Sequence, residues 1–194
     1  FITSYPFPKD ASEFPDMSII EINRGCPRGC LFCAAGYLCL PFRNRPLKFI
    51  MDFIKDTHPQ EKTIGLLGTG VSDYPDLLPL SREILKLGYC LSFSSLRIDR
   101  ITEDLANILH QSGQKTVTLA PEAGSQRLRN LIKKGITEEQ ILAAVDTLIR
   151  HDILNLKFYF MIGLPGETMD DVHAIPSLVR KVRHTILSHR HATK

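Results

Sequence analysis

Short apolar segments alternate with amphipathic segments along most of the chain, and this alternation predicts repeated βα units. The apolar segments are rich in β-branched and aromatic residues, as strands are, and the segments between them repeat their apolar positions with helical spacing. The predicted strands cover residues 18–23, 63–67, 90–96, 115–120 and 154–162. Because strands that alternate with helices pair in parallel, an α/β fold is expected.

The predicted helices are recognised by their ends as well as by their periodicity. They cover residues 47–57, 77–87 and 102–112, a segment ending near 134, and two segments that begin at 137 and near 170. Gly88 and Gly113 are typical residues for the end of a helix. Thr137 and Gln140 have the spacing of a capping box. Pro176 is a site where the last helix can kink.

These units predict a partial TIM barrel of five or six parallel strands, with its functional loops at the carboxyl ends of the strands. Glycine-rich or cysteine-rich segments follow the strands at those ends. We expect a lead-in over residues 1–17 and one core domain over residues 18–194, truncated after the fifth βα unit. The chain begins at Phe1, and no further strand is evident after the last helix, so a piece of a longer protein is expected.

Composition and charge exclude little. The chain has 194 residues, of which 43% are hydrophobic, enough for a globular core. Its net charge of +3 is spread along the chain, so nucleic acid is not indicated as a partner. No apolar run approaches the roughly 20 residues that cross a bilayer, and the first residues lack a signal-peptide pattern. A cytoplasmic protein without a membrane partner is expected.

Three of the five cysteines, Cys26, Cys30 and Cys33, fall within eight residues. This spacing favours metal binding in a reducing compartment over a disulfide framework. Structural zinc usually has four ligands, whereas three thiolates on a four-iron cluster leave one iron open for a small molecule. The alternatives are three incidental cysteines, or a closed electron-transfer cluster with Cys39 as fourth ligand. Cys39 and Cys90 are more simply interpreted as small core residues.

The pattern Cys-x-x-x-Cys-x-x-Cys, with the aromatic Phe32 before the last cysteine, resembles the signature of the radical SAM superfamily. The resemblance implies a [4Fe-4S] cluster on Cys26, Cys30 and Cys33, with S-adenosylmethionine bound to the open iron. It further implies reductive cleavage to a 5′-deoxyadenosyl radical that acts on a substrate. The substrate and the catalytic residues stay unknown, and an electron donor such as flavodoxin or ferredoxin is the expected partner.

Further segments extend the resemblance over residues 10–180 and imply positions that contact S-adenosylmethionine. Gly68-Thr69-Gly70 stands where many relatives have Gly-Gly-Glu, a segment that receives the ammonium group. Glu122 matches a residue on the ribose hydroxyls, and Lys134 matches an arginine that pairs with the carboxylate, although Lys133 is an alternative. The remaining implied contacts are Phe32, Ser95, Arg97, Ile162 and Gly163, the last two in a motif that cradles adenine.

Three of these segments also have a purely structural interpretation. Gly68 to Gly70 is compatible with an ordinary turn between a strand and a helix, Arg97 with a surface residue, and Glu122 with an exposed loop residue. Because those interpretations need no ligand, the cofactor contacts other than the cysteines rest on the resemblance.

Within the superfamily, the resemblance is closest to proteins that carry a cobalamin-binding domain, and methylthiotransferases and Elongator-type enzymes are more distant. It implies cobalamin as a further cofactor, held by a domain outside this chain. The alternative functions are cobalamin-dependent radical SAM methyl transfer and a non-catalytic iron–sulfur electron-transfer module. The segments that carry this resemblance are residues 13–16, 34–37, 43–45, 95–99 and 120–125.

Overall fold

The computed structural model describes residues 4–5, 16–94 and 96–192 and divides the chain into two compact units. The first unit comprises Phe1–Arg28, Ala34–Ser95 and Gln111–Gln114, and the second comprises Gly29–Cys33, Leu96–His110 and Lys115–Lys194. Of the predicted lead-in at residues 1–17, the structure describes residues 4–5 and 16–17. The boundaries of a core domain at residues 18–194 stay a prediction.

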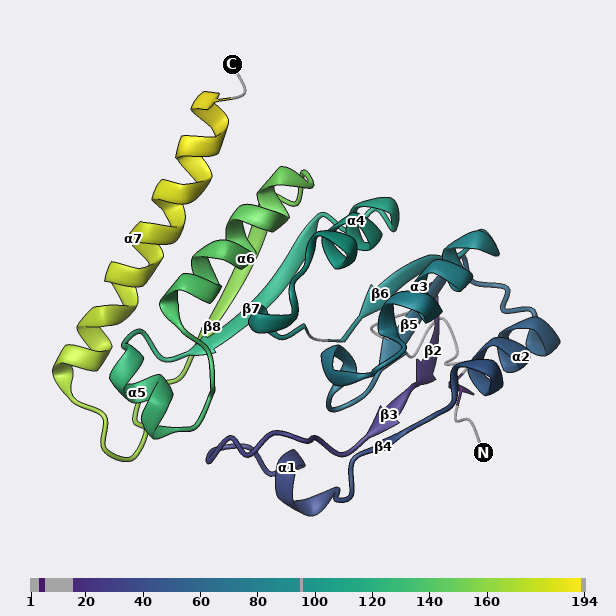
Figure 1. The fold of residues 1–194 in the computed structure, drawn as a ribbon, viewed down its shortest axis with the longest axis horizontal. Helices are drawn as coiled ribbons and strands as arrows, with labels where there is room; N and C mark the ends of the chain where they lie inside the picture. Colours follow the sequence, from purple (N-terminus) through teal and green to yellow (C-terminus); the bar gives the residue numbers. More distant parts are fainter. Residues whose placement is uncertain (1–3, 6–15, 95, 193–194) are drawn as a thin grey trace. The chain divides into compact units, whose positions relative to one another are not determined.

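The first unit is built on a four-stranded sheet in the order β1-β2-β5-β6 (Figure 1). Strands β2, β5 and β6 are parallel, with Ile19 opposite Gly65 and Gly65 opposite Ser92. The short β1 pairs antiparallel with β2. The strands are β1 (Ser4–Tyr5), β2 (Met17–Glu21), β5 (Thr63–Leu67) and β6 (Cys90–Phe93), and the helices are α2 (Leu47–Thr57) and α3 (Leu77–Lys86).

One face of this sheet is buried and the other is open. Because side chains alternate along a strand, the register places the buried residues of neighbouring strands on one face. Helices α2 and α3 supply the apolar partners Ile50, Ile54, Leu80 and Ile84. A hollow of about 220 Å³ on the sheet is lined by residues that include Met17, Ile19, Gly65 and Ser92. The buried apolar side chains of these strands are those of Ile20, Ile64, Leu66 and Leu91.

The first unit also contains short elements that the sequence pattern did not predict. Two-residue strands β3 (Asn23–Arg24) and β4 (Arg43–Asn44) pair antiparallel, with Arg24 opposite Arg43. The other additions are the helix α1 (Ala35–Leu38) and the 3₁₀ turn η1 (Val71–Asp73). Such elements are too short to produce a periodic hydrophobic pattern.

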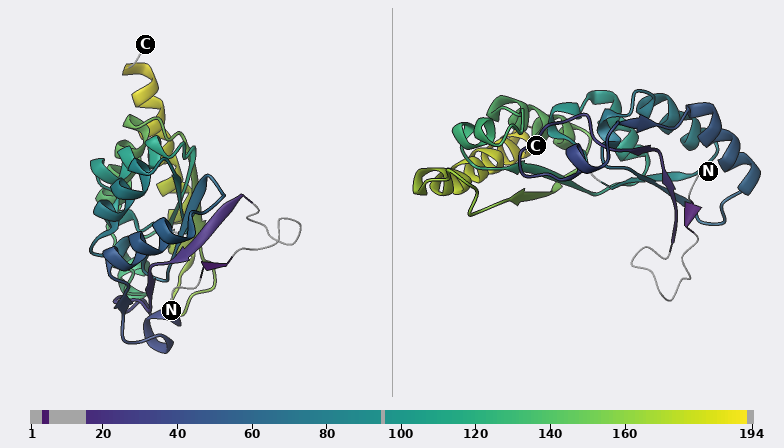
Figure 2. Two further views of the ribbon diagram at one scale, coloured as in Figure 1. Left: turned by 90° about the vertical axis from the view of Figure 1, so that its right-hand side faces the viewer. Right: turned by 90° about the horizontal axis from the view of Figure 1, so that it is seen from below.

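The second unit contains the parallel pair β7-β8, with Val117 opposite Leu156 and Leu119 opposite Phe158. As in the first unit, the helices lie against one face of the strands (Figure 2). Its elements are η2 (Ile98–Arg100), α4 (Glu103–Gln111), β7 (Thr116–Glu122), α5 (Gln126–Leu131), α6 (Glu138–Arg150), β8 (Asn155–Phe160) and α7 (Met169–Ala192).

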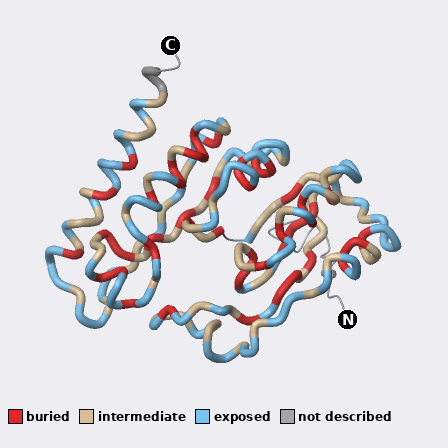
Figure 3. Tube along the Cα trace, in the orientation of Figure 1, coloured by how far each residue is buried: buried red, intermediate tan, exposed pale blue. Residues whose placement is uncertain are grey.

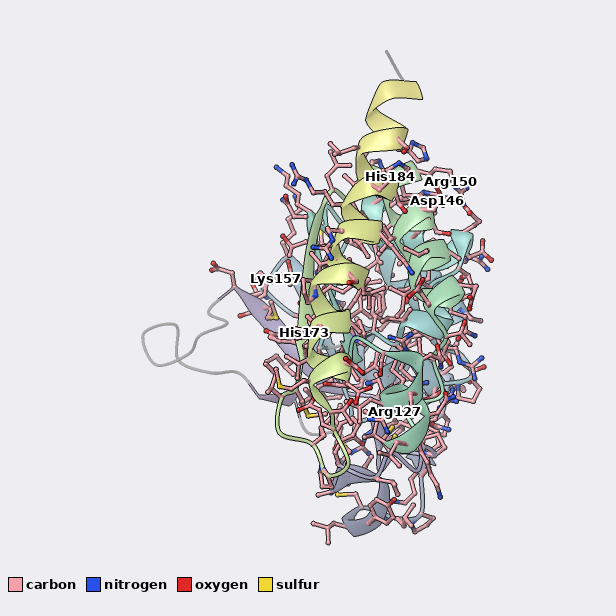
Figure 4. All side chains as sticks on the ribbon, turned by 90° about the vertical axis from the view of Figure 1, so that its left-hand side faces the viewer. Arg127, Asp146, Arg150, Lys157, His173 and His184 are labelled. Carbon is pink, nitrogen blue, oxygen red and sulfur yellow. The ribbon has the colours of Figure 1, made fainter. Side chains whose placement is uncertain are left out.

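The core of the second unit is formed by buried residues of α4, α6 and β7. Buried positions recur along α6 at helical spacing, from Ile141 through Val145 to Leu148 (Figure 3). The opposite face of β7-β8 is more open, and Lys157 of β8 is exposed there (Figure 4). The predicted capping box is confirmed, because Thr137 accepts a hydrogen bond from the amide of Gln140 and the Gln140 side chain accepts one from the amide of Thr137.

The α/β class with parallel strands is confirmed, and each predicted strand and helix has its counterpart within a few residues. Pro176 lies inside α7. Among the described strands, the parallel ladders form two sheets rather than one closed barrel, which is consistent with the expected partial barrel. No helix within the described residues is long and apolar enough to span a membrane.

Candidate functional site

The predicted site residues follow the carboxyl ends of parallel strands in both units. In the first unit, Cys26 follows β2 and β3, and Gly68 to Gly70 follow β5. In the second unit, Glu122 ends β7, and Ile162 and Gly163 follow β8. Ligands bind at this edge of parallel sheets, so each unit contributes one group of candidate residues.

The cysteine segment passes from one unit to the other. Cys26 belongs to the first unit, whereas Cys30 and Cys33 belong to the second. The amide of Cys33 donates a hydrogen bond to the carbonyl of Cys30, 3.2 Å away, so these two residues form a turn. Within the described residues, no three histidine, cysteine or acidic side chains are grouped closely enough to hold a metal ion. The three-cysteine ligand set therefore stays a prediction.

The backbone before Cys26 depends on glycine. Gly25 has a φ of +87°, and a Cβ atom there would lie 2.3 Å from the carbonyl oxygen of Cys39. A side chain would therefore be strained by conformation and blocked by backbone. An ion pair joins Arg28, two residues after Cys26, to the largely buried Asp73, with 2.5 Å between Nη2 and Oδ1. This arrangement fixes the amino-terminal half of the cysteine segment on the first unit.

Asn23 joins the cysteine segment to the glycine loop after β5. Its side-chain amide donates to the carbonyl of Gly70 at 2.8 Å, and its Oδ1 accepts from the amide of Gly70 at 3.2 Å. A Cβ atom on Gly68 would lie 2.1 Å from the same Oδ1. The hydroxyl of Thr69 donates to the carbonyl of Gly25. The predicted loop Gly68 to Gly70 is thus attached directly to the residues that precede Cys26.

The carboxyl-terminal half of the cysteine segment is anchored on α5. The amide of Leu31 donates to the carbonyl of Ile132 at 3.0 Å. Phe32 packs against a buried apolar cluster made of Ala123, Leu128 and Ile132. Leu164, from the loop after β8, packs on the same cluster. Phe32 therefore links the chain between Cys30 and Cys33 to the ends of β7 and β8.

Three residues predicted to contact the cofactor come together in the second unit. The ammonium of Lys134 lies 3.0 Å from Oε1 of Glu122, and both side chains are largely buried, at 11% and 14% exposure. The same ammonium lies 5.6 Å from the centre of the Phe32 ring, within the range of a cation–π contact. Glu122 itself has a φ of +69°, a conformation uncommon for residues with a side chain. We call Phe32, Glu122 and Lys134 the charged cluster.

Arg97 contacts the backbone of Lys134, and its guanidinium also pairs with Asp99. Its Nε donates to Oδ1 of Asp99 at 2.8 Å, and its Nη2 donates to the carbonyl of Lys134 at 3.3 Å. The alternative residue Lys133 is exposed, so the charged cluster favours Lys134. Ser95, the other candidate after β6, lies outside the described residues.

The loop after β8 is hydrogen-bonded to the end of β7. The amide of Met161 donates to the carbonyl of Glu122 at 2.8 Å. Gly163 has a φ of +90°, and its amide donates to the carboxylate of Glu167 at 2.6 Å. The side chain of Ile162 is 72% exposed. An exposed aliphatic residue beside the charged cluster is suited to contact a planar apolar ligand group.

Two buried charged residues that the sequence did not single out shape the loop after β7. The fully buried Arg129 donates through Nη1 to the carbonyls of Ala123 and Gly124, at 2.9 and 3.0 Å. Asp171 accepts hydrogen bonds from Ser125 and Arg127. Arg127 lies beside the start of α7 (Figure 4). These bonds, that from Arg127 foremost, hold the pKa of the Asp171 carboxyl well below its usual value.

The two remaining cysteines are partly buried residues of the first unit. Cys90 begins β6, and Cys39 follows α1. Both lie outside the Cys-x-x-x-Cys-x-x-Cys spacing of the predicted ligand set, so they can serve as control positions.

Comparison with solved structures shows a shared fold at low sequence identity. The radical S-adenosylmethionine methyltransferase TsrM of Kitasatospora setae, solved with cobalamin and a [4Fe-4S] cluster, superposes with a TM-score of 0.70 at 17% identity. The match covers 85% of this chain and 34% of TsrM. The α/β arrangement described above is thus the arrangement of the corresponding part of that enzyme.

Sequence comparison extends over nearly the whole chain. An uncharacterized protein of Methanocaldococcus jannaschii is 37% identical over 95% of this chain and 42% of its own length. A tRNA-2-methylthio-N(6)-dimethylallyladenosine synthase of Fusobacterium nucleatum is 29% identical over 84% of this chain and 40% of its own length. The chain therefore spans about two fifths of these curated relatives. The family model of the radical SAM superfamily matches residues 20–179, and the chain belongs to this superfamily of enzymes, which use a [4Fe-4S] cluster and S-adenosylmethionine.

Proposed function

We propose that this chain holds a [4Fe-4S] cluster through Cys26, Cys30 and Cys33 and binds S-adenosylmethionine beside it. The observation that carries the proposal is the charged cluster, because Phe32 stands directly before Cys33 and contacts the ammonium of Lys134. Residues distant in the sequence therefore meet beside the cysteine segment. When bound, the cluster would supply the electron for reductive cleavage of the sulfonium to a 5′-deoxyadenosyl radical.

The chemistry of the donor set fits such a cluster. Thiolates are the usual ligands of iron–sulfur clusters, and three of them leave one iron for a chelating ligand. The surrounding segment has the glycines and the fixed backbone that a close approach requires, as the contact between Gly25 and Cys39 illustrates. The amino group and the carboxylate of S-adenosylmethionine are suitable ligands for the open position.

The other residues are proposed to bind and orient S-adenosylmethionine. Backbone carbonyls of Gly68 to Gly70 would accept hydrogen bonds from its ammonium group, since Asn23 holds this loop in place. Glu122 would accept hydrogen bonds from the ribose hydroxyls, and Lys134 would pair with the carboxylate. Ile162 and the backbone of Gly163 would cover the adenine and exclude water from it.

Substitution of Glu122 by glutamine tests this cofactor site. The Glu122→Gln variant keeps the shape of the side chain but loses the charge that pairs with Lys134 and accepts hydrogen bonds strongly. We expect the affinity for S-adenosylmethionine to fall about tenfold, as measured by calorimetry on anaerobically reconstituted protein. Glu103→Gln, at an exposed glutamate of α4 in the same unit, is the control. Equal affinities in both variants would remove Glu122 from the site.

A second candidate is transfer of a methyl or methylthio group. It is supported by the similarity to the methyltransferase TsrM, which was solved with cobalamin, and to a tRNA methylthio synthase. For cobalamin-dependent methyl transfer, cobalamin would be held by a domain outside this chain. Cobalamin-dependent methyl transfer would yield S-adenosylhomocysteine in addition to 5′-deoxyadenosine, so product analysis with the intact protein separates it from the first proposal. In either case we propose a cytoplasmic flavodoxin or ferredoxin as electron donor.

A further inference from the structure

Arg129 of α5 is a charged residue that the second unit buries completely. Burial lowers the pKa of its guanidinium below the ordinary value, as expected for a cation held away from water. Among the described residues, no group accepts a hydrogen bond from its Nε. Because burial of a charge and of an unpaired donor both cost free energy, stability alone does not account for this residue. Its presence therefore points to a geometric role.

The guanidinium of Arg129 fixes the backbone directly after Glu122. Its Nη1 donates to the carbonyls of Ala123 and Gly124, at 2.9 and 3.0 Å. The carbonyl of Glu122 itself accepts a hydrogen bond from the amide of Met161 at 2.8 Å. Glu122 has a φ of +69°, and such a conformation persists only where the surrounding structure enforces it. These three hydrogen bonds hold Glu122 in that conformation and so set the direction of its side chain.

The main chain of Arg129 holds the other member of the ion pair. The amide of Lys134 donates to the carbonyl of Arg129 at 2.9 Å, across the end of α5. The chain then turns at Gly135, which has a φ of +66°. One residue therefore contacts the backbone beside Glu122 through its side chain and the backbone of Lys134 through its carbonyl.

Gln126 connects the same guanidinium to the segment that follows Lys134. Its Oε1 accepts a hydrogen bond from Nη2 of Arg129 at 3.0 Å and another from the amide of Glu138 at 3.2 Å. Its side-chain amide donates to the carbonyl of Ile136 at 3.2 Å. The backbone on both sides of Lys134 is thus tied to α5.

We propose that Arg129, supported by Gln126, is a positioning residue for the pair of Glu122 and Lys134. It acts through the backbone of both partners and so maintains the 3.0 Å separation between the ammonium and the carboxylate. Being fully buried, Arg129 acts on a ligand only through these two residues. Assignment of this role to binding of S-adenosylmethionine rests on the proposed function, whereas the positioning itself does not.

Residue-resolved hydrogen exchange of the intact protein tests the positioning without the cluster or the cofactor. Arg129→Lys keeps the positive charge, but one ammonium cannot replace the planar fork that reaches two carbonyls and Gln126 at once. We expect the amides of Lys134 and Met161 to exchange about tenfold faster than in the wild type, since their acceptors lose a fixed position. The amide of Val145, inside α6, should exchange as before. A residue that served only overall stability would accelerate all three amides alike.

Gln126→Ala is the second variant, because Gln126 is only partly buried and loss of its side chain leaves a smaller cavity. It should accelerate exchange at the amide of Lys134 and leave that of Val145 unchanged. Arg183→Lys, at an exposed arginine of α7, is the matched control and should change neither amide.

The cofactor enters as a separate readout on reconstituted protein. Arg129→Lys should weaken binding of S-adenosylmethionine about tenfold. If it acts through Glu122, the double variant with Glu122→Gln should lose less affinity than the product of the two single effects predicts.

Two results would overturn the inference. The first is unchanged exchange at the amides of Lys134 and Met161 in Arg129→Lys. The second is equal acceleration at these amides and at Val145, because that result is the signature of general destabilisation. Local acceleration combined with unchanged affinity for S-adenosylmethionine in Arg129→Lys and Glu122→Gln would contradict the proposed function alone, so the two failures are distinguishable.

Discussion

Replacement of any one of Cys26, Cys30 and Cys33 by alanine is expected to reduce bound iron and sulfide after anaerobic reconstitution to background and to abolish cleavage of S-adenosylmethionine. Two thiolates cannot hold a four-iron cluster that already lacks a fourth protein ligand. Iron content and the absorption of the cluster measure the effect.

The two remaining cysteines provide matched controls for this experiment. Cys39→Ala and Cys90→Ala remove thiols of the first unit that lie outside the Cys-x-x-x-Cys-x-x-Cys spacing of the proposed ligand set. Both variants should keep the iron content of the wild type. If Cys39→Ala loses the cluster and one of the three other variants keeps it, the proposed ligand set is wrong and must include Cys39.

Substitution of Gly124 by alanine is expected to cause the largest loss of stability. A Cβ atom on Gly124 would lie 2.3 Å from the amide nitrogen of Ile175 and 2.5 Å from the carbonyl carbon of Ala174. Both contacts are to the backbone of α7, which cannot yield as a flexible side chain does. The cost of such overpacking is about 3 kcal/mol. For a chain of this size, that corresponds to a decrease in melting temperature of roughly 6–12 °C, measurable by circular dichroism.

Gly29→Ala is the control for this effect. Apart from Gly29 itself and its two neighbours in the chain, no heavy atom lies within 4 Å of the position that a Cβ would occupy on Gly29. Its melting temperature should therefore stay within about 2 °C of the wild type, as for exposed substitutions elsewhere. Equal melting temperatures of Gly124→Ala and Gly29→Ala would mean that α7 does not pack on the loop after β7 as described.

The long elements of the fold could be predicted because their hydrophobic patterns are local. The strand at Thr63–Leu67 and the helix at Leu47–Thr57 have the predicted boundaries, since Pro46 and the segment before Thr63 interrupt the pattern. The β3-β4 hairpin could not be predicted, because each strand has two residues and their pairing spans the cysteine segment.

The candidate site was predicted where residue type alone is informative. Three cysteines at this spacing, and glycines after a strand, imply a ligand before any contact is known. Asn23 and Arg129 were not found, because a single asparagine or arginine acquires its role only through distant partners such as Gly70 and Ala123. The resemblance favours Lys134 over Lys133, and the contact of Lys134 with Glu122 and Phe32 supplies a physical reason.

The most direct test of the central claim is the electron paramagnetic resonance spectrum of the anaerobically reconstituted, dithionite-reduced protein, recorded with and without S-adenosylmethionine. Three protein ligands leave one iron open, so we expect the signal of a reduced four-iron cluster whose g values shift when S-adenosylmethionine is added. A four-iron signal that is identical with and without S-adenosylmethionine would contradict binding at an open iron and would favour a closed electron-transfer cluster.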